Sequence, residues 1–547
     1  MAYGRDAWQR GLVLVVALAC AGRAWGQGDG LPPVSDLLGP SDRLSGGLAV
    51  RVERYDFAGH TVFTTEQLRE TVAPYTGDAV TTEMLEAARM AVTQRYINAG
   101  YINSGAVIPD QTVSDAVVVM QITEGTLTQV VVQGNRHLAS ARVEGRVRSG
   151  LGEPLNINAL RDQLEIFRQD PLIERFKAEL SPGGEPGQSV LDLHVTENSP
   201  WQAGLLYNNH NPPSTGAEKL SVLASHASVT GVGDALGLVY GVTQGGWDDP
   251  QLAGLDDIYV DYTRPLNDHG LSVSLGYARS STLTVEDTFA DLDIESESQD
   301  GWLTLRQSVW RTPSTEFALA VRTDIRDNQT TLGGEPFSFE PGAEDGYTQL
   351  TVLRFIQEFV HRTPRDAFAA RSTFSVGLPL FGATQNDDAP DGEFFAWLGQ
   401  VQYVHRLFDT SNQFVVRGAA QLADDSLLAL EQIAVGGVNS VRGYRENQIV
   451  RDQALLGTIE FRLPLILDVN EREQLTLVPF ADLGHGYNAS SPRDSQTLPS
   501  VGVGLVFTPN RHVNMELFWG YAFKDFDTPE DTLQDAGIHF SITLLAF

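Results

Sequence analysis

The chain has 547 residues and a formal net charge of −32 at pH 7, from 38 lysines and arginines against 70 aspartates and glutamates. This balance excludes a nucleic-acid-binding protein, which needs a basic face. The mean hydropathy of −0.15 excludes a bundle of membrane-spanning helices but is compatible with a large barrel, because half of a barrel wall faces water.

Residues 1–26 have the pattern of a secretory signal peptide. Two arginines precede an apolar run at 12–19, which is too short to span a bilayer, and small residues before Gln27 predict cleavage there. Cleavage removes Cys20, the only cysteine, so we expect neither a disulfide nor thiol chemistry in the mature chain. The alternative, a lipoprotein signal at Cys20, normally has a larger aliphatic residue where Ala17 stands.

A linker and a compact αβ unit follow. Residues 27–48 contain Gly, Pro and Ser with little pattern, as linkers do. The second helix of the unit has apolar residues at three- and four-residue spacing, and Thr81 or Thr82 caps it. Over residues 49–125 we predict strands at 48–52, 55–57, 102–108 and 116–122, and helices from residue 65 and over 82–99.

Residues 126–197 repeat this pattern, with strands at 127–132 and 190–195 and a helix at 160–167. Both units end on the dipeptide Thr-Glu. A repeated pattern of this length indicates two units in tandem. The exposed strand edges of such units can accept an extended peptide by strand addition.

Over residues 198–547 helical periodicity almost disappears, and short alternating runs recur, for example at 258–263, 271–277 and 538–544. At about ten residues per strand and a similar connection, this length allows roughly sixteen strands of a transmembrane β-barrel. The alternative is a soluble array of β-sandwiches. The terminal Phe547 lies out of phase with the apolar face of the last run, so the usual barrel-targeting signal is altered here.

One connection, of about thirty residues between the alternating runs 414–422 and 455–465, is far longer than a hairpin loop. A loop of this length is either functional or disordered, and its apolar residues and glycines argue against disorder. Among its arginines, Arg442 and Arg445 have planar side chains that suit carboxylate partners.

The run Gly-Val-Asn-Ser-Val-Arg-Gly-Tyr at 437–444 resembles the loop signature of the ShlB/FhaC/HecB haemolysin-secretion family, the outer-membrane exporters of two-partner secretion. A second element of that family, Phe-Ala-Asp-Leu-Gly, stands at 480–484. The resemblance implies that the loop folds back into the barrel and meets this strand on the inner wall. The implied site residues are Val441, Arg442, Gly443 and Tyr444 from the loop and Phe480, Asp482 and Gly484 from the wall.

The alternation of the wall strand predicts which way its side chains point. Phe480 and Asp482 share one face, and Ala481 and Leu483 share the other. Because a carboxylate facing lipid is costly, Asp482 is expected to point into the lumen, where Arg442 can pair with it.

The two αβ units resemble POTRA domains, including the step from Tyr96 to Gly100 and Tyr101. The resemblance implies a sixteen-stranded outer-membrane barrel preceded by two periplasmic POTRA domains. It further implies capture of an extended, Sec-exported partner exoprotein, contact with outer-membrane lipid and lipopolysaccharide, and insertion by the barrel-assembly machinery. Some members carry a helical plug, for which residues 27–48 are too short together with a tether.

Two other functions remain open at this point. An insertase of the BamA/TamA kind usually has three to five POTRA units, and a passive porin does not need them. The sequence has no Gly-x-Ser-x-Gly elbow, no His-Glu-x-x-His helix and no phosphate-binding loop. We therefore expect no enzymatic activity, no cofactor and no metal.

Overall fold

The computed structural model describes residues 49–243, 256–286, 290–387, 390–408, 411–468, 472–491, 494–528 and 532–546. The predicted signal peptide, the linker with its expected lack of a plug, and Phe547 lie outside these residues. The described residues form two compact units, which divide between Asn198 and Ser199. No described helix is long and apolar enough to cross a membrane.

The N-terminal unit contains a three-stranded sheet in the order β2-β5-β4, in which β2 and β5 are parallel and β4 is antiparallel to β5. Thr81, one of the two predicted caps, caps the longer helix, because its side chain accepts a hydrogen bond from the N–H of Met84. A short edge strand, β3, was not predicted. The elements are β1 (Ala49–Val52), β2 (Arg54–Ala58), α2 (Thr65–Val72), β3 (Gly77–Thr81), α3 (Thr82–Asn98), β4 (Gly105–Val107) and β5 (Val117–Thr123).

The second sheet repeats this topology, because β6 and β8 are parallel and β7 lies antiparallel to β8. The prediction omitted α4 and β7. Helix α4 has no side-chain cap, and its only buried residues are one apolar pair at helical spacing, Val143 and Val147, so its sequence signals are weak. The elements are β6 (Thr126–Gln133), α4 (Ser140–Arg148), α5 (Ile157–Arg168), β7 (Ile173–Pro182) and β8 (Gln188–Glu197).

A glutamate at the end of the last strand fixes the same loop in both repeats. Glu124 accepts hydrogen bonds from the N–H groups of Thr61 (2.7 Å) and Val62 (3.0 Å), in the loop between β2 and α2. Glu197 accepts hydrogen bonds from the N–H groups of residues 136–138, in the loop between β6 and α4. The shared Thr-Glu ending is therefore a structural clamp that each repeat carries.

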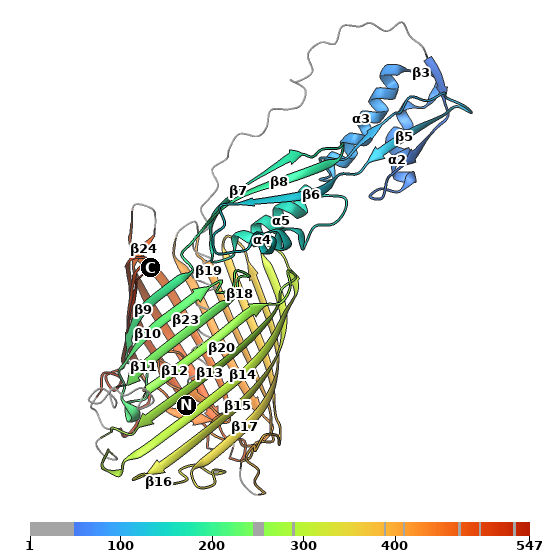
Figure 1. The fold of residues 1–547 in the computed structure, drawn as a ribbon. Coiled ribbons are helices and arrows are strands. Elements are labelled where there is room, and N and C mark those ends of the chain that lie inside the picture. Colours follow the sequence, from blue (N-terminus) through green and yellow to red (C-terminus); the bar gives the residue numbers. More distant parts are fainter. Residues whose placement is uncertain are drawn as a thin grey trace. The chain divides into compact units, whose positions relative to one another are not determined.

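From Trp201 onward the described residues form a closed barrel (Figure 1). It has sixteen long antiparallel strands, as predicted, and β27 pairs with β9. The two-residue strand β16 (Glu335–Pro336) extends one hairpin. The long strands are β9 (Trp201–Asn208), β10 (Lys219–Ala227), β11 (Ala235–Thr243), β12 (Asp256–Pro265), β13 (Leu271–Leu283), β14 (Ile294–Arg311), β15 (Thr315–Leu332), β17 (Tyr347–Arg362), β18 (Asp366–Gly377), β19 (Phe395–Arg406), β20 (Gln413–Ala423), β23 (Gln453–Leu467), β24 (Glu473–Tyr487), β25 (Gln496–Asn510), β26 (Val513–Ala522) and β27 (Ile538–Leu545).

The long connection between β20 and β23 is ordered and contains a small hairpin, β21 (Ile433–Val435) and β22 (Ile449–Arg451). Asp452 closes its base, because its carboxylate accepts from the N–H of Leu427 (3.0 Å) and from the N–H of Ala489 (2.8 Å). We call residues 424–452 the returning loop, since its middle packs on the inner side of the wall.

Candidate functional site: the returning loop and its wall

The structure brings Arg442 of the returning loop onto Asp482 of β24. The Nε and Nη2 atoms of Arg442 each donate to one carboxylate oxygen of Asp482, both at 2.8 Å, and the backbone N–H of Arg442 adds a third bond at 3.0 Å. The side chains are 2% and 0% exposed. Strand β24 points Asp482 inward, as its alternation predicts, while Leu483 remains exposed on the outer face.

A second carboxylate, Glu460 of β23, completes the site and was missed. Nη1 of Arg442 donates to it at 2.7 Å, and Arg417 of β20 also donates to the same carboxylate. Glu460 pairs with Phe480 in the register of β23 and β24. Its place on the polar face of an alternating run was visible in the sequence, but the register that brings it beside Asp482 was not.

Phe480 lies beneath the guanidinium of Arg442, with the carbon of that group 3.6 Å from the ring centroid. Phe518 of β26 stands 5.1 Å from the same carbon. A cation over an aromatic face is stabilised by the negative charge density of the ring, more strongly where water is excluded. The aromatic and acidic positions of the wall motif therefore hold one arginine from two directions.

The glycine of the wall motif makes room for the loop. A Cβ at Gly484 would stand 2.4 Å from a methyl of Val435 and 2.7 Å from a methyl of Val441. Both valines are fully buried. Residues 480, 482 and 484 lie on one face of the strand. The motif therefore presents an aromatic ring, a carboxylate and then an open space to the loop, and each contacts a different part of it.

Gly443 allows the backbone of the loop to touch the backbone of the wall. It has a φ of +92°, and its Cβ would lie 2.8 Å from the carbonyl of Gly520 in β26. Gly520 and Gly537, which follow far along the chain, complete this contact: a Cβ at Gly537 would stand 2.1 Å from the oxygen of Gly520. Neither was predicted, because nothing local in the sequence marks them.

Tyr444 is 3% exposed, and its hydroxyl donates to the carbonyl of Pro499 at 2.9 Å and accepts from the N–H of Lys524 at 3.1 Å. Arg445 binds carboxylates of two other loops, Glu286 at 2.6 Å and Asp535. All four loop residues and all three wall residues of the predicted site thus lie together, and Arg445 ties the loop to its neighbours.

This arrangement holds a segment of the returning loop against the inner wall. Its polar groups are engaged with one another, and within the described residues no group of three or more His, Cys, Asp or Glu side chains is placed to hold a metal ion. The chemistry available is the making and breaking of shielded ion pairs that fix the loop inside the barrel.

Two protein-family models match parts of this chain. Residues 187–507 match the model for the haemolysin secretion/activation protein ShlB/FhaC/HecB, and residues 50–125 match the ShlB-type POTRA domain. The outer membrane transporter CdiB of Dickeya dadantii (strain 3937) is 24% identical over 431 residues, 76% of this chain and 72% of that protein. The heme/hemopexin transporter protein HuxB of Haemophilus influenzae (strain 86-028NP) is 21% identical over 475 residues, 81% of this chain and 78% of that protein.

A solved structure, CdiB from Escherichia coli, has the same fold, with a TM-score of 0.69 and 22% identity. The match covers 99% of this chain and 98% of that one.

Proposed function

Because the chain belongs to the ShlB/FhaC/HecB haemolysin secretion/activation family of outer-membrane transporters, we propose that it exports one partner exoprotein by two-partner secretion. The partner reaches the periplasm unfolded, binds the αβ units as an extended segment, and passes through the barrel to the cell surface. The observation that carries this proposal is the returning loop, which lies inside a closed barrel and is held there by ion pairs and buried apolar side chains.

Capture is assigned to residues 49–198. We treat both repeats as POTRA-like units, on the grounds that they share sheet topology and the glutamate clamp. Among the described strands β7 pairs only with β8, so its other side offers backbone groups to an extended peptide. The edge of β4 is covered, because the N–H and C=O of Ala106 are bonded to Thr93 and Arg89 of α3. Lipid and lipopolysaccharide surround the barrel in this proposal, and the barrel-assembly machinery inserts it.

Secretion of the candidate partner, encoded next to this chain, tests the proposal. Cells expressing both should place the partner outside, and cells lacking the transporter should retain it in the periplasm. The isolated fragment 49–198 should bind the unfolded secretion segment but not the folded partner. Retention of secretion without the transporter would contradict the proposal.

The same cells separate the alternatives. An insertase would lower the amounts of many other outer-membrane proteins when it is removed, whereas an exporter leaves them unchanged. A porin would raise uptake of small solutes with no dependence on a partner. Either result in place of partner retention would assign the barrel to that other class.

A further inference from the structure

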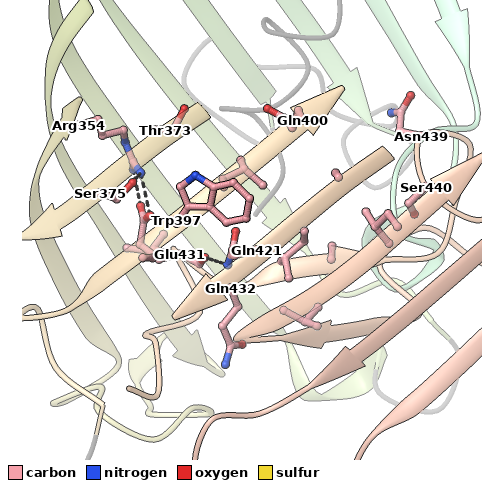
Figure 2. Close-up of a pocket in the computed structure, with 18 of the residues that line it drawn as sticks. Arg354, Thr373, Ser375, Trp397, Gln400, Gln421, Glu431, Gln432, Asn439 and Ser440 are labelled. Atoms are coloured by element: carbon pink, nitrogen blue, oxygen red, sulfur yellow. Dashed lines mark hydrogen bonds and ion pairs between the residues drawn. The ribbon is translucent and has the colours of Figure 1, made fainter. Parts of the chain in front are cut away.

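The returning loop is also held on a second part of the wall, where no motif marks it. Before it reaches Arg442, the loop places Glu431 against β17 and β15 (Figure 2). Nη1 and Nη2 of Arg354 donate to the two oxygens of Glu431 at 3.0 and 2.6 Å. Nη1 of Arg326 donates to Glu431 at 2.7 Å and to the carbonyl of Leu430 at 2.7 Å.

Glu431 joins a cluster of wall charges in which arginines outnumber carboxylates. The cluster consists of Arg322 and Arg326 of β15, Arg354 of β17, Asp300 of β14 and Asp324 of β15. These three arginines and two carboxylates leave one excess positive charge, and Glu431, which is 8% exposed, supplies a third carboxylate. A neighbouring arginine, Arg371, lies 3.9 Å from Glu358, a carboxylate that it shares with Arg306.

An apolar contact lies directly beside this ion pair. Three leucines of the loop, Leu427, Leu428 and Leu430, are at most 7% exposed and pack on the wall near the start of β17 and β19. The buried leucines and the bidentate contact between Arg354 and Glu431 together bind this part of the loop specifically, and we call them the Glu431 site. In the barrel order, β17, which carries Arg354, is separated from β23, which carries Glu460, by three strands, β18, β19 and β20.

A pocket of about 270 Å³ lies beside the loop between the Glu431 and Arg442 sites. It is lined by Asn439 and Ser440 of the loop and by Trp397 and Gln400 of β19 (Figure 2). Ile433 and Val435, which lie between the two sites in sequence, are at most 2% exposed and pack in one cluster with Leu456 of β23. The loop is therefore held by apolar contacts as well as by its two ion-paired residues.

We propose that Glu431 is a second positioning residue of the transporter, which fixes the first half of the returning loop on β15 and β17 while Arg442 fixes its tip on β23 and β24. Movement of the loop then requires that both ion pairs open. This inference rests on the proposed transport function only for its consequence in secretion, since the position of the loop can be measured without a partner.

The test measures how well the loop is held. Ile433, two residues after Glu431, is 2% exposed. We would replace it with cysteine, replace Cys20, the only native cysteine, with serine, and follow maleimide labelling of the purified barrel in detergent. In the Glu431→Gln variant labelling should be at least about tenfold faster, which corresponds to about 1.4 kcal/mol of lost anchoring. Glu431→Asp, which keeps the charge, should restore slower labelling.

Glu358→Gln is the matched control. Glu358 of β17 binds Arg306 of β14 at 2.8 Å, a wall-to-wall pair in the same lumen. This variant should label at the parent rate and secrete the partner normally. Equal acceleration in Glu358→Gln and Glu431→Gln, or no acceleration in Glu431→Gln, would overturn the inference.

A second variant tests the same contact if the Glu431→Gln barrel does not insert into the membrane. Arg354→Lys keeps the charge but cannot form the bidentate contact, so it should also accelerate labelling. An unchanged rate in an inserted Arg354→Lys barrel would overturn the inference. If labelling accelerates while the partner is secreted normally in every variant, Glu431 anchors the loop and its consequence for secretion is overturned. Secretion of the partner without the transporter would overturn the proposed function and leave the labelling result unaffected, so the two failures are distinguishable.

Discussion

At the residue scale, Arg442 combines paired carboxylates, an aromatic face and complete shielding from water. Asp482 receives all its described side-chain donors from this one arginine, whereas Glu460 also has Arg417. Losing the arginine therefore leaves Asp482 as an uncompensated buried charge, but losing Asp482 leaves Arg442 with Glu460. The two partners of the pair are not equivalent.

From this asymmetry we expect Arg442→Ala to reduce secretion more than Asp482→Ala. Breaking a fully buried pair by removing one partner costs about 3–5 kcal/mol, and less where lumen water screens the remaining charge. The double variant should be no worse than Arg442→Ala, because both changes break the same contact. Arg442→Lys should rescue poorly, since an ammonium cannot reproduce the planar contact. Secreted partner per inserted barrel is the measurement.

The exposed Arg511, in the turn between β25 and β26, is the control for general loss of charge. Wild-type secretion from Arg442→Ala would show that the ion pair has no mechanical role in export.

Gly484→Ala should also impair secretion, through shape rather than charge. The added methyl meets Val435 and Val441 at distances that real Cβ atoms do not show, so the loop must move away from β24. Overpacking of this kind typically costs about 1–3 kcal/mol. Gly457→Ala in β23 adds the same methyl where nothing lies within 4 Å and should be neutral. Thermal unfolding and secretion of the two variants provide the comparison, and equal behaviour would rule out the steric account.

At the scale of elements, the glutamate clamp makes a prediction about pH. Burial alone would raise the pKa of Glu124, but hydrogen bonds from Thr61, Val62 and Tyr96 outweigh it and lower the pKa below 4.5. A carboxylate whose pKa falls on folding stabilises the fold above the unfolded value, and this contribution is lost as pH falls through the folded value. The fragment 49–198 should therefore lose stability below about pH 4.5.

Glu124→Gln should lower the stability of that fragment at pH 7 by about 1.5–3 kcal/mol, the range for hydrogen bonds to a charged group. It should also flatten the pH dependence of the melting temperature below pH 4.5, which is followed by circular dichroism. An unaltered pH profile in Glu124→Gln would assign the acid loss to other carboxylates.

Much of this architecture can be predicted from the periodicity of the sequence. Periodicity also limits the prediction, because it describes each strand by itself. Alternation predicted the barrel strands and the inward direction of Asp482, because side chains on a strand repeat every two residues. It could not give the register between strands, which places Glu460 beside Asp482. Glu431 was missed for a related reason, since its partners Arg326 and Arg354 lie about a hundred residues earlier in the chain.

At the scale of the whole molecule, the barrel is closed unevenly. Strands β27 and β9 pair only over 541–545 and 204–208, whereas β14 and β15 pair over most of 294–311 and 316–332. Hydrogen exchange depends on the local opening of such pairings. In detergent, amides of the β27–β9 seam should exchange before those of β14 and β15, as mass spectrometry can measure. Uniform protection around the barrel would contradict this expectation.

The contact among Gly443, Gly520 and Gly537 has a consequence for how variation in this chain should be interpreted. Three positions spread over 95 residues share one small volume, into which no methyl group fits. A survey of random variants would therefore find them about as intolerant as Arg442 and Asp482, although they carry no charge and donate nothing from a side chain. Intolerance to substitution at these glycines would mark where the loop contacts the wall. Compensating changes would be expected among the three glycines rather than at their neighbours in sequence.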